Sequence, residues 1–243
     1  MLGRTHRFDA RGFPRLVRLL RRERVAIVHG WLPFANLYAR ISGTLARVPV
    51  RVTAEGATLS ARPRRYALLN RFLSPLTDAY VANSEAVAAI LREQGVPAKK
   101  IAVIPNGVAV PKILSDEERT RLRAELGASP DVQLVGFVAR LDPRYKDHGT
   151  FLAAVAALVS EGRQVRAAIV GGGGSREPLE RQAAELGIAD RVVFTGYRAD
   201  ASRLMGAFDV SVMLTYSEGF SNVVLEAMAS GVPLLTTAIP PNR

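Results

Sequence analysis

The sequence predicts an α/β protein with two Rossmann-like domains, each a doubly wound parallel sheet covered by helices. Short apolar segments rich in Val and Ile alternate with helical patterns along nearly the whole chain. Strands that are buried on both faces of a parallel sheet have this composition. A polar, proline-containing connection at 108–118 separates two such series. We therefore expect one domain at residues 1–112 and a second at residues 113–243.

The order of the elements follows from the same pattern. Segments 25–31, 48–54, 78–84 and 101–107 predict the strands of the first domain, and segments 132–141, 165–174, 191–197, 209–219 and 232–238 predict those of the second. Ser84 is placed to cap a helix that ends at Gly95. Ser115 and Glu118 have the spacing of a capping box at the first helix of the second domain.

The positive charge is concentrated in the first half of the chain. Residues 1–115 carry 19 Lys and Arg against 6 Asp and Glu, whereas residues 116–243 carry 14 against 16. Either the first half faces an anionic partner, or the excess reflects a general preference for Arg over Lys. Aromatic residues do not interleave with the basic ones, so nucleic acid is not expected. An anionic membrane surface or a phosphorylated lipid fits better.

Composition also excludes several kinds of site. The chain has no cysteine, which rules out disulfide and thiolate chemistry. His6, His29 and His148 are scattered and lack metal-ligand spacing. No Asp-x-Asp triplet occurs, and no apolar run approaches the roughly 20 residues of a membrane span. We expect no metal and no bound cofactor.

Two cations follow the first strand of the second domain. Arg140 and Lys146 lie six residues apart in "VARLDPRYKDHG", across a turn built on Pro143. Ligands of open parallel sheets bind beyond the carboxyl ends of the strands. A guanidinium and an ammonium there would suit a diphosphate. The alternative is an ordinary solvated loop.

The next strand ends in four glycines, 171–174. Gly171 and Gly172 would let the backbone approach a ligand closely. The run matches neither the dinucleotide fingerprint nor a phosphate-binding P-loop. A tight strand-to-helix turn explains it equally well.

The stretch "EGFSNVVLEAMASG", 218–231, places one carboxylate before a helix and a second inside it. Ser221 or Asn222 caps the predicted helix, and Gly231 ends it. The helix start, with Gly219 and Phe220, offers backbone N–H groups to a phosphate. Glu226, one turn further on, could accept hydrogen bonds from vicinal hydroxyls such as those of a ribose. The alternative is a solvated helix residue.

This stretch resembles the E-x7-E signature of the family 4 glycosyltransferases, retaining enzymes of the GT-B fold. "VGFVARLDPRYKDHGTFLAAV", "AIVGGGG", "VVFTGYRAD", "VANSEAV" and "IAVIPNGV" are similar to other segments of the family, in the right order. The resemblance covers about residues 25–238. It implies a GT-B-like pair of domains that face a cleft. It also implies a UDP- or GDP-sugar as donor substrate, a glycolipid or glycan acceptor, and two cations in place of a metal ion.

The resemblance assigns roles to individual residues. Glu226 would hold the ribose, and Glu218 the hydroxyls of the transferred sugar. Gly219, Phe220 and Ser221 would supply backbone donors, and Arg140 and Lys146 would neutralise the diphosphate.

His29, in "IVHGW", resembles a sugar-contacting histidine of the first domain, although a buried structural histidine explains it as well. Glu55 is an acceptor-side candidate. The strand and glycine-rich loop with which the family begins have no match before Phe8, and the chain stops at "IPPNR". We therefore expect both domains to be incomplete.

The sequence thus predicts a retaining, metal-independent glycosyltransferase that acts on a cell-envelope glycolipid or polysaccharide. The alternatives are a truncated, non-catalytic nucleotide-sugar-binding protein and another GT-B enzyme such as a sugar epimerase. We expect a cytoplasmic protein. The Arg-rich helix 13–23 either attaches it to the inner face of the membrane or packs on its own sheet. The oligomeric state does not follow from the sequence.

Overall fold

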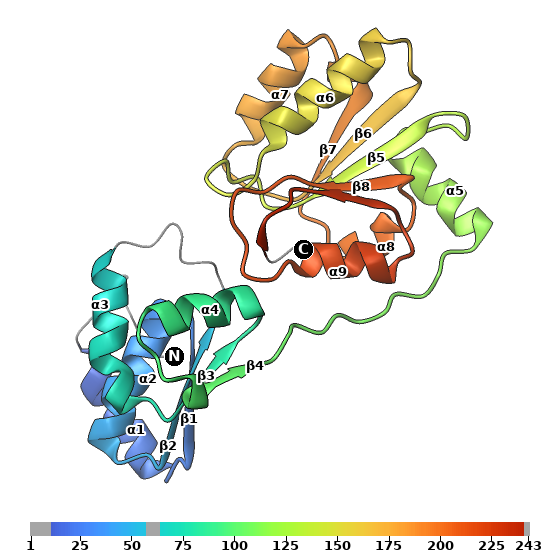
Figure 1. The fold of residues 1–243 in the computed structure, drawn as a ribbon. Helices are drawn as coiled ribbons and strands as arrows, with labels where there is room; N and C mark the ends of the chain where they lie inside the picture. Colours follow the sequence, from blue (N-terminus) through green and yellow to red (C-terminus); the bar gives the residue numbers. More distant parts are fainter. Residues whose placement is uncertain (1–10, 57–63, 241–243) are drawn as a thin grey trace. The chain divides into compact units, whose positions relative to one another are not determined.

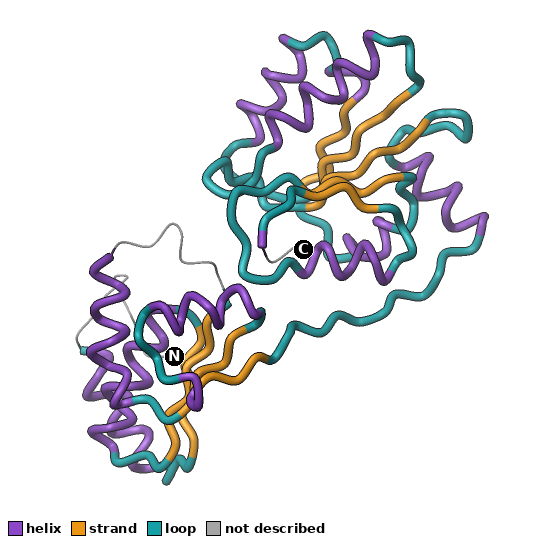
Figure 2. Tube along the Cα trace, in the orientation of Figure 1, coloured by secondary structure: helices purple, strands orange, loops and turns teal. Residues whose placement is uncertain are grey.

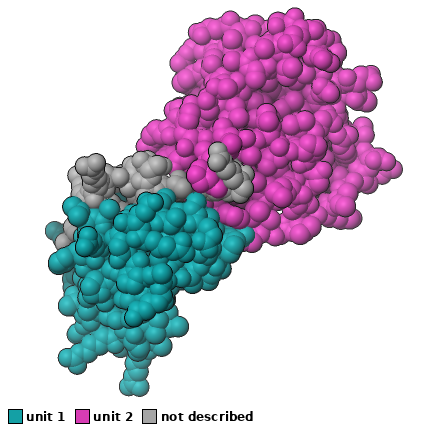
Figure 3. Space-filling view, in the orientation of Figure 1, with its two compact units in different colours: residues 1–106 teal, residues 107–243 magenta. Residues whose placement is uncertain are grey.

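The computed structural model describes residues 11–56 and 64–240. The chain divides into two compact units, unit 1 at residues 1–106 and unit 2 at residues 107–243 (Figure 3). Each unit is an α/β layer structure around a parallel sheet (Figure 1). Figure 2 shows the helices of each unit against its strands. The α/β class with two parallel sheets is therefore confirmed.

Unit 1 contains a four-stranded parallel sheet in the order β1-β2-β3-β4. Its elements are α1 Gly12–Arg22, β1 Ile27–Trp31, α2 Pro33–Ala46, β2 Val50–Glu55, α3 Arg64–Leu73, β3 Ala79–Ala82, α4 Glu85–Glu93 and β4 Ile101–Val103, with short 3-10 turns at Ser74–Leu76 and Ala98–Lys100. Ser84 caps α4 by accepting a hydrogen bond from the Val87 N–H. This cap confirms the helix start predicted from the sequence.

The strands of unit 1 follow one another across the sheet without a reversal of order. Right-handed crossovers between strands in sequential order place the connecting helices on one face, and Figure 1 shows them together on one side. On β1, the alternate residues Ile27, His29 and Trp31 are exposed, whereas Gly30 between them is buried. The face of this edge strand that points away from the helices is therefore not covered by the described residues.

Helix α1 packs on α2 through its apolar side. The Phe13 ring stacks on the Tyr38 ring with centroids 4.3 Å apart, and Leu20 is buried. The Arg-rich helix predicted at 13–23 thus packs on its own unit, against a helix rather than the sheet.

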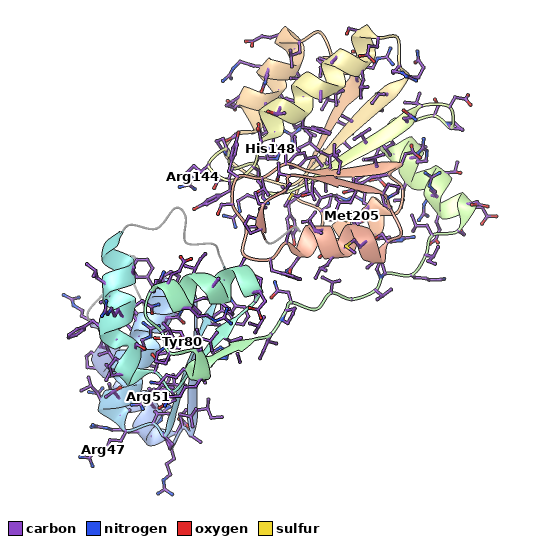
Figure 4. The ribbon with its side chains drawn as sticks, in the orientation of Figure 1. Arg47, Arg51, Tyr80, Arg144, His148 and Met205 are labelled. Atoms are coloured by element: carbon purple, nitrogen blue, oxygen red, sulfur yellow. The ribbon has the colours of Figure 1, made fainter. Side chains whose placement is uncertain are left out.

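A buried polar cluster ties the helices of unit 1 to its sheet. Arg40 of α2 is 2% exposed and donates a hydrogen bond to the Asn70 side chain of α3 at 2.6 Å. Its guanidinium lies 5.2 Å from the centroid of the Tyr80 ring. Tyr80 lies on β3 inside unit 1 (Figure 4). Buried charge of this kind is costly unless partnered, so the cluster fixes the position of these elements.

Unit 2 contains a five-stranded parallel sheet in the order β7-β6-β5-β8-β9. Its elements are α5 Asp116–Glu125, β5 Gln133–Val138, α6 His148–Ser160, β6 Val165–Val170, α7 Arg176–Glu185, β7 Val192–Gly196, α8 Ala201–Met205, β8 Val210–Met213, α9 Asn222–Ala229 and β9 Leu234–Thr236, with a 3-10 turn at Ala189–Arg191. The sheet is buried on both faces. One apolar cluster lies beneath α6 and α7, and a second lies beneath α5, α8 and α9.

Helix α5 is fastened to unit 2 by charged side chains. Ser115 and Glu118 form the predicted capping box at its start. Asp209, just before β8, accepts hydrogen bonds from Arg123 at 2.8 Å and Arg119 at 2.6 Å, and from the Leu134 N–H at 2.7 Å. Burial alone would raise the pKa of Asp209, but these donors together lower it.

Candidate active site

The candidate site lies where the strand order of unit 2 reverses. β5 is central, and the chain proceeds outward from it through β6 and β7 on one side before it returns to β8 on the other. Ligands of open α/β sheets bind at such a switch point, beyond the carboxyl ends of the two strands. The two loops concerned are residues 139–147, after β5, and residues 214–221, after β8.

Backbone hydrogen bonds join these two loops. The Asp147 N–H donates to the Leu214 carbonyl at 3.1 Å, and the Tyr216 N–H donates to the Tyr145 carbonyl at 2.9 Å. Lys146 and Thr215 form an antiparallel bridge between them. The loops therefore hold a fixed position relative to each other.

The bridge brings Lys146 and Glu218 together. The Lys146 ammonium contacts the Glu218 carboxylate as an ion pair, and the two side chains are only 12% and 21% exposed. The Met213 sulfur lies 3.6 Å from the same ammonium. The sequence placed both residues in the site but did not predict their pairing. The signal it could have used is the adjacency of β5 and β8 in a doubly wound sheet.

Arg140 lies at the end of β5 and lines a separate cavity of about 350 Å³. The other lining residues come from the carboxyl ends of β5, β6 and β7 and the start of α8: Val138, Ala139, Val170, Gly171, Gly172, Tyr197, Arg198 and Ala201. Arg198 is held by Asp200 at 2.7 Å and by Glu125. Arg140 is exposed and forms no ion pair within residues 11–56 and 64–240, so its charge is available to an anion.

The glycine run has two roles that alternate along it. Gly171 and Gly173 have φ values of +149° and +156°, and a Cβ there would lie 1.8 Å from the Ala139 oxygen and 2.5 Å from the Leu141 oxygen, respectively. These two glycines are required by the close approach of the loop after β5. A Cβ on Gly172 would meet only Tyr197, at 3.8 Å, and would enter the cavity. Close packing of the backbone therefore explains Gly171 and Gly173, whereas a role of Gly172 beside a ligand stays a prediction.

Helix α9 begins where the sequence predicts. Ser221 is its N-cap residue in an extended conformation, without a side-chain capping bond, and Gly231 follows its end with a φ of +69°. Gly219 and Ser221 are buried at the helix start, and Phe220 is partly buried. The first backbone N–H groups of a helix have no partner within the helix, and this start follows the loop after β8.

Glu226 is partly buried on α9 and lines a second cavity, of about 530 Å³. Asn222 of the same helix and Asp200, Ser202 and Arg203 around α8 line it too, and residues of the 107–114 segment and Glu118 complete the wall. The α8 residues Asp200 and Ser202 flank Ala201, which lines the Arg140 cavity. The start of α8 therefore separates the two cavities.

His148 anchors the end of the Lys146 loop. It lies inside unit 2 at the start of α6, whereas Arg144 lies at the edge (Figure 4). The His148 ring is 2% exposed and 4.5 Å from the Phe137 ring, and burial lowers its pKa to about 4. The Arg144 guanidinium pairs with Asp142 and lowers the pKa of that carboxyl to about 2.

In unit 1, the structure places His29 and Glu55 differently. His29 is exposed on β1, with its ring centroid 5.9 Å from that of Trp31, so the alternative of a buried histidine is wrong. Glu55 is 1% exposed at the end of β2, where it accepts a hydrogen bond from Asn36 at 2.9 Å. In the described part of the chain, no group of three or more His, Cys, Asp and Glu side chains is arranged to hold a metal ion.

Comparison with known proteins identifies the class. A family model described as Glycosyltransferase Family 4 matches residues 1–110, and one described as Glycosyl transferases group 1 matches residues 132–243. The chain is thus a glycosyltransferase by family. It belongs to the family 4 glycosyltransferases of the GT-B fold.

Two relatives illustrate this similarity. D-inositol 3-phosphate glycosyltransferase of Nocardia farcinica is 34% identical over 206 residues, which are 81% of this chain and 45% of the relative. The lipopolysaccharide core biosynthesis glycosyltransferase LpsE of Rhizobium meliloti is 31% identical over 161 residues, 66% of this chain and 44% of the relative. The chain therefore spans less than half the length of these relatives.

Solved structures agree in fold. Anabaena Alr3699/HepE in complex with UDP-glucose superimposes with a TM-score of 0.86 and 26% identity, covering 96% of this chain and 64% of that chain. WaaG, a glycosyltransferase involved in lipopolysaccharide biosynthesis, has a TM-score of 0.77 at 20% identity, covering 99% of this chain and 67% of that one.

Proposed function

We propose that the chain carries the donor site of a retaining glycosyltransferase that transfers a sugar from a nucleotide-sugar without a metal ion. The observation that carries the proposal is the arrangement at the switch point of unit 2. Arg140 lines a cavity beside Gly172, and Lys146 lies further along the same loop, where it is bridged to Thr215 of the loop after β8. Two cations on the loop after β5, together with the start of α9 after the neighbouring strand β8, suit a diphosphate.

The proposed mechanism is electrostatic. As the glycosidic bond breaks, negative charge grows on the leaving nucleoside diphosphate. Arg140 and Lys146 would stabilise that charge in the transition state, which is the role a divalent ion has in other transferases. Glu226 would hold the ribose and Glu218 the sugar hydroxyls. Gly219, Phe220, Ser221 and Asn222 would direct N–H groups at the phosphates, with Gly171 and Gly172 beside the nucleotide.

A UDP-sugar is the first donor to test, because a structure 26% identical to this chain holds UDP-glucose; a GDP-sugar is the second. A thermal-shift panel of UDP, GDP and their glucose and mannose conjugates, with and without EDTA, addresses the donor and the metal together. We expect stabilisation by one nucleotide series that survives EDTA and is lost in Arg140→Ala and Glu226→Ala. No stabilisation by any compound would refute the donor site.

Retention of configuration is proposed from the family, and the anomeric configuration of a transferred sugar, read by proton NMR, tests it. An inverted product would contradict it. Binding without transfer or hydrolysis would favour the alternative of a nucleotide-sugar-binding protein that does not catalyse.

The acceptor is proposed to be a cell-envelope glycolipid or polysaccharide, bound at unit 1. His29 and Trp31 are exposed on β1 and offer a polar and an aromatic surface to a glycan. Glu55, the other acceptor-side candidate of the sequence, is 1% exposed and accepts a hydrogen bond from Asn36, so the exposed His29 and Trp31 are better placed to contact a glycan.

For access to a lipid-linked acceptor, we propose that the protein is cytoplasmic and attaches peripherally to an anionic membrane through α3. Its Leu68 and Phe72 are 67% and 80% exposed, one turn apart, and Arg71 between them is exposed as well. An exposed apolar stripe beside basic residues is typical of helices that lie in a membrane interface. Helix α1 is less suited, because Leu20 is buried against unit 1.

No helix in the described ranges is long and apolar enough to cross a membrane. Sedimentation with phosphatidylglycerol vesicles tests attachment. The double variant Leu68→Ser and Phe72→Ser should lose binding, and the control Leu19→Ser on α1, which removes a side chain 39% exposed, should keep it. Equal binding by both variants would contradict a role for α3.

A further inference from the structure

The two residues of the Lys146–Glu218 ion pair have separate roles in the proposed function, yet they neutralise each other in this structure. The ammonium contacts the carboxylate directly, and both side chains are largely buried. An ion pair shielded from water in this way is stronger than one at an exposed surface. The diphosphate that Lys146 would bind therefore has to compete with Glu218.

The backbone of the two loops that carry Lys146 and Glu218 is held together by hydrogen bonds, which keeps the two side chains close to each other. The bridge between Lys146 and Thr215 fixes the first loop, and Thr215 is 2% exposed and donates its hydroxyl to the Tyr145 carbonyl at 2.8 Å. Glu218 follows Thr215 by three residues on the same loop. The carboxylate therefore lies beside the ammonium whenever nothing else occupies the site.

The other charged groups of the site are arranged differently. The Lys146 loop carries two carboxylates of its own: Asp142 is paired with the Arg144 guanidinium at 2.8 Å, and Asp147 accepts a hydrogen bond from the Thr150 N–H at 3.0 Å. Arg140 has no such partner among the described residues. Of the two cations assigned to the diphosphate, Arg140 is thus exposed and Lys146 is paired with an internal carboxylate.

We propose that Glu218 is an internal counter-ion of Lys146 that favours release of the nucleoside diphosphate after transfer. The inference rests on the proposed function. With an intact nucleotide-sugar, the sugar hydroxyls would donate hydrogen bonds to Glu218 while the diphosphate takes Lys146, so both charges are partnered. Once the sugar has left, Glu218 has no hydroxyl partner and its charge lies close to the terminal phosphate. Repulsion between like charges and the return of the ion pair then favour dissociation.

Glu218 should weaken the binding of UDP, the product that has lost its sugar. UDP has no sugar hydroxyl to donate to Glu218, so the carboxylate only repels its terminal phosphate and competes with it for Lys146. Replacing the carboxylate by an amide should therefore strengthen UDP binding, whereas loss of a residue that merely positions Lys146 would weaken it. Product affinity should rise by about threefold to tenfold, where tenfold corresponds to about 1.4 kcal/mol.

Isothermal titration of UDP into the full chain tests this. The variants are Glu218→Gln, Glu218→Ala as a second form of the same change, and Asp142→Asn as the matched control. The control removes one negative charge from the Lys146 loop and leaves the Lys146–Glu218 pair intact. We expect tighter UDP binding in both Glu218 variants and binding within about twofold of the unsubstituted chain in Asp142→Asn, because the Asp142 charge is already paired with the exposed Arg144 guanidinium.

The same Glu218→Gln change made in a Lys146→Met variant shows how much of its effect depends on the ion pair. In Lys146→Met, the gain from Glu218→Gln should fall to less than half, because there is no ammonium left to release. An unchanged or weaker UDP affinity in both Glu218 variants, an equal gain in Asp142→Asn, or an undiminished gain in Lys146→Met would overturn the inference and leave the donor site standing. Failure of the unsubstituted chain to bind UDP or GDP at about 1 mM, the upper end of ordinary KM values, would refute the proposed function itself.

Discussion

The alternation within the glycine run gives a prediction that separates folding from binding. A Cβ on Gly171 would lie 1.8 Å from the Ala139 oxygen, and φ there is +149°. A carbon and an oxygen in van der Waals contact are more than 3 Å apart, so the backbone would have to move by more than about 1 Å. Gly171→Ala should therefore lower the free energy of unfolding by about 3 kcal/mol or more, as overpacking and strain together do.

Gly172→Ala should behave in the opposite way. The nearest atoms to its Cβ belong to Tyr197, at 3.8 and 3.9 Å, so the free energy of unfolding should change by less than about 0.5 kcal/mol. The methyl group enters the cavity beside Arg140, however, and should weaken UDP binding by about fivefold, or about 1 kcal/mol. Gly174→Ala is the matched control, since a Cβ there has no neighbour within 4 Å.

Urea denaturation and UDP titration of the three variants check both parts. If Gly172→Ala destabilises the chain as much as Gly171→Ala does, the claim that Gly171 but not Gly172 is required for packing is wrong. If Gly172→Ala binds UDP as tightly as Gly174→Ala does, the cavity is not the nucleotide site.

Two further predictions concern stability. The pKa of His148 is about 4 in the folded chain and 6.5 in the unfolded chain, so protonation of this ring favours the unfolded state. The contribution of His148 to the free energy of unfolding should therefore be constant above about pH 6.5 and fall by about 3 kcal/mol as the pH is lowered to 4. His148→Gln should remove part of this acid sensitivity in urea titrations at several pH values, and an unchanged pH profile would contradict it. Asp209→Asn leaves Arg123, whose side chain is 6% exposed, without its carboxylate, and should cost about 3 kcal/mol by thermal denaturation. Asp142→Asn leaves only the exposed Arg144 side chain, 76% exposed, without its carboxylate and should change the melting temperature little. An equal loss in the two variants would refute the difference between them.

Local sequence signals predicted the elements well. The caps at Ser84 and at Ser115 with Glu118 form as expected, because a cap depends on residues three positions apart. The continuous apolar strands predicted both parallel sheets, since burial on both faces leaves a direct mark on composition. The E-x7-E stretch placed the start and end of α9.

Contacts between distant segments could not be predicted in the same way. Lys146 and Glu218 are 72 positions apart and meet only because β5 and β8 are neighbours. Gly171 is required because the backbone of the loop after β5, at Ala139, packs directly against it, and the glycine run alone does not reveal this contact. Whether His29 is buried depends on what covers β1, and the helices of unit 1 lie on the other face of that strand.

The central claim is that unit 2 binds a nucleoside diphosphate through Arg140. Isothermal titration of UDP and GDP into the chain, into Arg140→Ala and into Arg181→Ala tests it most directly, because Arg181 is also an exposed arginine but lies on α7, outside both cavities. We predict that one nucleotide binds, that Arg140→Ala weakens it by about tenfold or more, as loss of a charged hydrogen bond does, and that Arg181→Ala leaves it unchanged. Equal affinity in the two variants would contradict the claim.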